Sequence, residues 1–143
     1  MSVFVDTNIL LRSVQPSDPS HDMAVRATAA LIDAGEVLIV TPQVIAEFWY
    51  AATRSREKNG LAMPFDKARQ ELNHLEGFFT VIGESPEVYR EWKNLVTLYG
   101  VSGVHAHDAR LVAAMKVYGI KRILTFDVDD FARYKNIIEV LHP

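Results

Sequence analysis

Short runs of apolar, mostly β-branched residues recur along the chain, and each ends at a polar residue or a glycine. Runs of this length that are apolar on both faces are typical of strands buried in a parallel sheet. Five strands are expected: Val3–Val5, Val37–Val40, Phe79–Ile82, Arg122–Phe126 and Ile137–Leu141.

Longer segments with apolar positions at helical spacing separate these runs. They predict helices over Met23–Ala34, Pro42–Arg54, Phe65–Glu76, Pro86–Tyr99 and Asp108–Tyr118. Ser20, Thr41 and Ser85 are expected N-cap residues, and a proline follows the last two at the first helical position. Ser55–Met63 is expected to be a loop between two helices.

The alternation of strands and helices predicts a parallel α/β sheet covered by helices on both faces. The length of 143 residues favours one domain, residues 1–143, with enough surface to bury a sizeable core. The chain has no internal repeat, low-complexity segment or linker that would indicate a second domain.

Composition excludes several kinds of site. The chain has no cysteine, which rules out disulfides, thiolate metal sites and a cysteine nucleophile. The N-terminus has no basic stretch before an apolar run, so it does not have the pattern of a signal peptide. Apolar runs are far shorter than the roughly 18 residues of a membrane span, and a cytoplasmic protein with no membrane role is expected.

Acidic residues follow the expected strands. Asp6 follows the first expected strand and Asp127 follows the fourth. Glu47 lies on the second turn of the helix that follows the second strand, and Asp108 begins the last long helix. Ligands of open α/β sheets bind at the carboxyl ends of the strands. Carboxylates gathered there repel one another, so a cation is expected to neutralise them. Oxygen ligands alone suit Mg²⁺ or Mn²⁺, which can activate water and hold a phosphodiester.

Four stretches carry a family resemblance: Val3–Leu10, Thr41–Phe48, His107–Met115 and Ile123–Phe131. Together they resemble the PIN-domain ribonucleases, specifically the VapC-like toxins of bacterial toxin–antitoxin pairs. The resemblance runs nearly end to end. It implies a three-layer α/β/α sandwich with a central, mostly parallel five-stranded sheet, and Mg²⁺- or Mn²⁺-dependent cleavage of single-stranded RNA. It also implies a small antitoxin as partner and a homodimeric assembly.

The same resemblance assigns roles to individual side chains. The acidic quartet is Asp6, Glu47, Asp108 and Asp127. Within it Asp6, Asp108 and Asp127 are expected to bind the metal, while Glu47 orients or deprotonates the attacking water. Asn8 and Thr125 match supporting polar positions, and Asp130 matches an acid at the edge of the site.

Basic residues near these motifs are possible RNA contacts: Arg12, Arg54, Arg110 and His107. His105 and His107 flank Ala106, but no further His or Cys completes a zinc site. Phe48–Tyr50 makes one helix apolar nearly all round. That helix is either buried or presents Trp49 or Tyr50 to a partner chain.

Three other functions remain open. One is a haloacid-dehalogenase-like phosphatase, in which Glu47 has no role. Another is a catalytically silent PIN-like binding module, which has no need of four separate carboxylates. The third is a PIN-type RNA-processing nuclease without a toxin role.

The formal net charge of −3 appears at first to disfavour a polyanionic partner. However, five of the 18 acidic residues belong to the expected cleft: Asp6, Glu47, Asp108, Asp127 and Asp130. The acids that remain are outnumbered by the 15 Lys and Arg, so the rest of the surface is mildly basic.

Overall fold

A computed structural model describes all 143 residues, and its centre is a five-stranded sheet in which every pair is parallel. The strand order is β3-β2-β1-β4-β5. The strands are β1 (Ser2–Val5), β2 (Val37–Val40), β3 (Thr80–Val81), β4 (Arg122–Leu124) and β5 (Glu139–Leu141). β1 is central and pairs with β2 on one side and β4 on the other.

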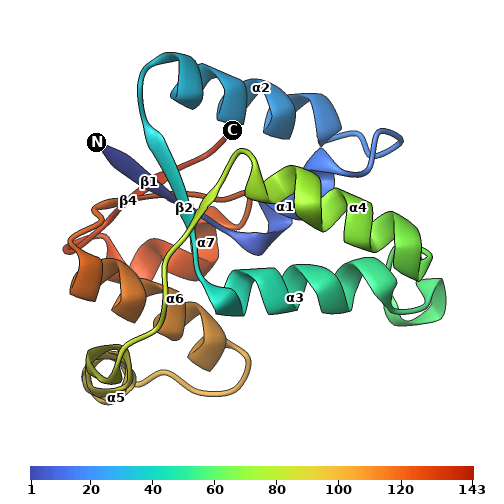
Figure 1. The fold of residues 1–143 in the computed structure, drawn as a ribbon. Helices are drawn as coiled ribbons and strands as arrows, with labels where there is room; N and C mark the ends of the chain where they lie inside the picture. The colour runs from blue at the N-terminus through green and yellow to red at the C-terminus, as the bar shows by residue number, and fades with distance from the viewer.

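Helices cover both faces of this sheet. On one face lie α1 (Thr7–Ser13), α2 (His21–Asp33), α3 (Pro42–Thr53) and α4 (Phe65–Glu76). On the other lie α5 (Pro86–Tyr99), α6 (His105–Tyr118) and α7 (Val128–Phe131) (Figure 1). The expected three-layer α/β/α architecture is therefore confirmed. None of these helices has the length and apolar character needed to cross a bilayer.

Burial of the apolar runs explains why they form the middle layer. Val3, Phe4 and Val5 are fully buried, as are Ile123 and Leu124 of the neighbouring strand. They are among the 27 buried hydrophobic residues of one continuous core. Strands apolar on both faces need helices on both sides, and the crossover connections supply them.

Two helices differ from the sequence expectation. Helix α1 was not expected from the sequence. It begins directly after β1 because the Asp6 side chain accepts a hydrogen bond from the Thr7 N–H and caps the helix. α6 begins at His105, three residues earlier than expected, after Gly103 adopts a positive φ of 63°. Asp108 therefore lies within the first turn of α6 rather than at its head.

The last two strands are shorter than expected and do not follow each other directly. β4 ends at Leu124 instead of Phe126, and β5 begins at Glu139 instead of Ile137. Between them the chain forms α7 and a 3₁₀ turn at Ala132–Tyr134. This crossover is needed because adjacent parallel strands cannot be joined by a tight turn.

The expected N-cap residues stand at the expected positions, but their side chains do not act as caps. Ser20, Thr41 and Ser85 do precede their helices, but none of the three side chains makes a capping hydrogen bond. Within α3, Tyr50 is the exposed aromatic residue, whereas Trp49 packs edge-on against Phe65 with ring centres 5.7 Å apart.

Candidate active site

Asp6 lies at the carboxyl end of β1, where the strand order changes direction. From β1 the chain builds outward through β2 on one side, and later returns to add β4 on the other. Such switch points leave a crevice beyond the strand ends. The Asp6 backbone N–H donates to the Leu124 carbonyl at 3.1 Å, which fixes the end of β1 against the end of β4.

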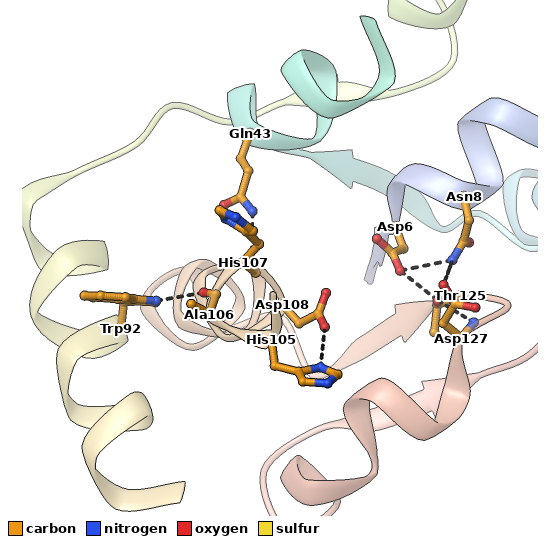
Figure 2. Close-up of polar contacts among 10 residues, drawn as sticks. All are labelled: Asp6, Asn8, Gln43, Trp92, His105, Ala106, His107, Asp108, Thr125 and Asp127. Atoms are coloured by element: carbon orange, nitrogen blue, oxygen red, sulfur yellow. Dashed lines mark hydrogen bonds and ion pairs between the residues drawn. The ribbon is translucent and has the colours of Figure 1, made fainter. Parts of the chain in front are cut away.

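Asn8 connects the two sides of this crevice. Its amide nitrogen lies 3.1 Å from both Thr125 Oγ1 and Asp127 Oδ2, and 3.3 Å from Asp6 Oδ2. Its carbonyl oxygen accepts from the Phe126 N–H at 3.2 Å. The fully buried Thr125 donates to Asp6 Oδ2 at 2.8 Å. Figure 2 shows these side chains converging from β1, α1 and the segment after β4.

Glu47 reaches the same region from α3 and is held at both carboxylate oxygens. Thr7 Oγ1 donates to Oε2 at 3.3 Å, and Gln43 Nε2 donates to Oε1 at 2.8 Å. Gln43 lies one helical turn before Glu47 and also donates to the His107 carbonyl at 3.0 Å. It therefore ties the orientation of Glu47 to the first turn of α6.

Asp108 enters from α6 with two neighbours. His105 Nδ1 lies 3.4 Å from Asp108 Oδ2 (Figure 2). One ligand atom each of His105, Asp108 and Asp130 lie within 4.8 Å of one another. His105 and Asp108 share a helix face because they are three residues apart, and α7 brings Asp130 against that face.

The electrostatics of the site disfavour the charged form of two carboxylates, Asp6 and Asp108. Burial raises the pKa of Asp6 to about 6, although hydrogen bonds from Thr125 and Thr7 act against the increase. The negative charges of Asp108 and Glu47 add to it. Burial also raises the pKa of Asp108, helped by Asp130 and Glu47 and opposed by His105. These mutual effects place Asp6, Glu47 and Asp108 within electrostatic range of one another.

This donor set fits a divalent cation. The converging side-chain atoms are carboxylate oxygens from separate elements, which is the chemistry that hard cations prefer. A cation would relieve the repulsion that raises the pKa values of Asp6 and Asp108. Asp127 joins them through Asn8, and its exposed carboxylate lies at the mouth of the crevice.

The four basic side chains expected to contact RNA lie in different parts of the structure. Arg12 Nε lies 3.6 Å from Asp18, at the far end of α1. Arg54 lies seven residues beyond Glu47, about 10 Å along the helix axis, with its guanidinium 5.0 Å from the centre of the Tyr50 ring. Arg110 forms an ion pair with Glu84. The exposed His107 is close to the crevice, on the first turn of α6.

Sequence reasoning missed three residues of the site: Thr7, Gln43 and His105. Each contacts a carboxylate that it had identified. Gln43 and Glu47 stand four residues apart and His105 and Asp108 three apart, so helical spacing could have paired them. For His105 that signal was lost because the helix was expected to begin at Asp108.

A family model described as the PIN domain matches residues 3–137. A search of curated proteins found no match. VapBC2 from Rickettsia felis, solved bound to a DNA fragment from its promoter, gives a TM-score of 0.73 at 15% identity, covering 99% of this chain and 98% of that chain. The Mycobacterium tuberculosis toxin VapC20, described as cleaving the sarcin–ricin loop, gives 0.68 at 23% identity, covering 99% of each chain.

VapBC-1 from nontypeable Haemophilus influenzae gives a TM-score of 0.71 at 14% identity, covering 99% of this chain and 98% of that chain. At these identities the structures establish a common fold, and the family model establishes membership because it spans nearly the whole chain. The resemblance read from the sequence motifs is thereby confirmed. The chain belongs to the PIN domain family, with the fold of the VapC toxins.

Proposed function

We propose that this protein is a metal-dependent endoribonuclease that cleaves single-stranded RNA and acts as the cytoplasmic toxin of a VapBC-type pair. The observation that carries the proposal is the convergence of carboxylates from β1, α3 and α6 on one crevice, where burial, and after it the charges of neighbouring acids, raise the pKa values of Asp6 and Asp108. Membership of the PIN family and the fold shared with VapC toxins support a nuclease rather than a phosphatase. Residues 1–143 would act as one domain, which the single core supports.

In this proposal Asp6, Asp108 and Asp127 would hold Mg²⁺ or Mn²⁺, with Asp130 and His105 at the edge of that set. The metal would supply positive charge to the scissile phosphate and increase the acidity of water. Glu47 accepts the proton of the attacking water, and Gln43 and Thr7 keep its carboxylate aimed at the crevice. Water attacks phosphorus, the bond to the leaving ribose oxygen breaks, and that oxygen takes up a proton from solvent, while the RNA 2′-OH takes no part.

The direct test is cleavage of a mixed pool of single-stranded RNA by the purified protein with Mg²⁺, Mn²⁺ or EDTA. Cleavage is expected with either metal and should disappear in EDTA. The variant Asp6→Asn should lose activity by at least about 100-fold, because a carboxylate that would hold the metal is removed. Asp22→Asn, on an exposed position of α2, is the matched control and should cleave like the wild type.

Equal rates for the wild type and Asp6→Asn would show that the site is wrongly assigned. Absence of cleavage with both metals, in a protein that still binds RNA, would instead favour the silent binding module.

The toxin role is tested separately from the nuclease. Production of the active protein in a bacterial host should arrest growth, whereas Asp6→Asn should not. Growth that continues while the purified protein cleaves RNA would favour a processing nuclease. A small antitoxin is proposed as a partner, supported by the solved VapBC structures that share this fold. A homodimer is proposed as the assembly, because the family resemblance implies one.

A further inference from the structure

A pocket outside the acidic crevice lies where the segment after β3 meets α5 and α6. Its volume is about 310 Å³, at the lower end of the roughly 300–1,000 Å³ of small-ligand pockets. Its walls are Glu84, Ser85, Val88, Tyr89, Trp92 and Arg110. Neither the family assignment nor the acidic quartet gives this pocket a role.

One wall of the pocket is a pair of aromatic rings. Tyr89 is 62% exposed, so most of its ring is open to solvent. Its ring centre lies 6.2 Å from that of Trp92, with an angle of 30° between the planes. Trp92 is fixed because its indole N–H donates to the Ala106 carbonyl at 2.8 Å (Figure 2). The pair offers a preorganised, partly open surface on which a planar group can stack.

The lining of the pocket also has a polar part. Arg110 and Glu84 form an ion pair there, with 41% and 35% of their side chains exposed. The pair holds a guanidinium donor and a carboxylate acceptor at adjacent positions. A planar ligand stacked on Tyr89 and carrying both donors and acceptors along its edge would match this arrangement. Unpaired nucleobases have this chemistry, and proteins that read single-stranded RNA bind them by stacking and by contacts to their edges.

The pocket is joined to the crevice through α6. Arg110 and Asp108 lie two residues apart on this helix, and Trp92 contacts it on the side away from Asp6 (Figure 2). The first turn of α6 thus separates the two sites.

We propose that this pocket binds one unpaired base of the RNA substrate, stacked on Tyr89 with its edge at the Glu84–Arg110 pair, while the strand continues over the first turn of α6 to the acidic crevice. This rests on the proposed function, because it names a binding subsite for the same RNA.

Binding is measured with fluorescein-labelled short oligo(A), oligo(C) and oligo(U) in the Asp6→Asn background with Mg²⁺, so that the RNA stays intact. Tyr89→Ala should weaken binding by about 10-fold, the size of one lost stacking contact. Tyr89→Phe should retain affinity, because it keeps the ring. Leu98→Ala is the matched control, since Leu98 is 77% exposed on the same helix but on its opposite side.

A second arm moves a single abasic position along the best-bound oligonucleotide. With Tyr89 present, an abasic site at one position should lower the binding affinity by a similar factor. In Tyr89→Ala, an abasic site at that same position should lower the affinity no further. Such non-additivity assigns the lost contact to one base. In otherwise wild-type protein, Tyr89→Ala should raise KM for cleavage and leave kcat within about twofold, as expected when uniform binding is removed.

Wild-type affinity and KM in Tyr89→Ala would overturn this inference, as would equal losses at every abasic position. Unchanged RNA binding together with a lower molar mass by light scattering would also overturn it, because the pocket would then be a contact between protein chains. These results leave the proposed function standing if the wild type cleaves RNA, whereas the absence of cleavage with both metals would refute the nuclease itself.

Discussion

At Asp6, burial and hydrogen bonding act in opposite directions on one carboxylate. The side chain is only 8% exposed, and burial raises its pKa to about 6 despite the donors Thr7 and Thr125. A folded-state pKa above the ordinary value of 3.8 means that the folded protein binds this proton more tightly than the unfolded chain. Without metal, the charged form of Asp6 therefore destabilises the fold at neutral pH.

The metal-free protein is predicted to lose stability as pH rises. The contribution of Asp6 is fully present below pH 3.8 and disappears as pH rises through about 6. The total change is up to about 3 kcal/mol, at about 1.4 kcal/mol per unit of pKa shift. Urea unfolding in EDTA across this range should show the decrease, and Asp6→Asn should flatten it. An equal slope in that variant would contradict the raised pKa.

Gln43 is a second residue of the site, and its role comes from the two hydrogen bonds that its side chain donates. It is buried and donates to both Glu47 and the His107 carbonyl, so it links α3 to α6 across the crevice. Gln43→Leu preserves most of the volume but removes both donors. We expect kcat to fall about 10-fold because Glu47 loses its fixed orientation, and stability to fall by about 1 kcal/mol because the hydrogen bond from α3 to the His107 carbonyl is lost.

This prediction is checked by steady-state cleavage kinetics and urea unfolding. Thr97→Val is the control, since its hydroxyl donates only to a carbonyl within α5 on an exposed surface. A Gln43→Leu variant with wild-type kcat would show that Glu47 does not need this contact.

At the scale of elements, the site depends on the side-chain hydrogen bonds that connect α1 to the segment between β4 and α7. Asn8 makes four contacts with three residues of that segment and with Asp6. The segment itself has left the sheet, because β4 ends at Leu124. Side-chain hydrogen bonds therefore replace strand pairing at the point where Asp127 is positioned.

Asn8→Ala is predicted to loosen this segment locally. The Phe126 N–H loses its acceptor, so its amide exchange should accelerate by about 10-fold or more, while amides of β2 exchange as before. Global stability should fall by about 1–3 kcal/mol. Asn94→Ala, on the exposed surface of α5, is the matched control. Unchanged exchange at Phe126 in Asn8→Ala would show that the contact does not hold the segment.

The strands and helices with strong periodic patterns of apolar residues were predicted correctly from the sequence. All five strands and the five long helices exist, and their order predicted the parallel sheet. α1 and α7 were missed because each follows a strand end almost directly and is only seven or four residues long. Short helices carry too little periodicity to be read, and their stability comes from tertiary contacts.

At the scale of the whole molecule, the charge distribution separates an acidic crevice from a mildly basic remainder. The net charge of −3 results from the carboxylates that the fold gathers at one edge of the sheet. A bound divalent cation would offset this excess, so metal binding should be coupled both to stability and to pH.

Mn²⁺ is predicted to raise Tm more at pH 7.5 than at pH 5, because protonated Asp6 binds metal poorly below its pKa of about 6. At a hundredfold excess over Kd the stabilisation is about 3 kcal/mol, a shift of about 6–10 °C for a chain of this size. Differential scanning fluorimetry of the wild type, Asp6→Asn and the control Asp22→Asn tests this. A full shift in Asp6→Asn, or equal shifts at both pH values, would contradict it.

The sequence alone was enough to predict the helical layers and the parallel sheet, because these depend on local patterns of apolar and polar positions. Its motifs also named the acidic residues that are proposed for the site. Only the tertiary structure decided that Asn8 bridges Asp6 to Asp127, that Gln43 orients Glu47, and that His105 and Asp130 stand beside Asp108. These contacts join elements separated by up to 119 residues. They depend on side-chain directions that the packing of α3, α6 and α7 onto the sheet sets, and no local pattern encodes them.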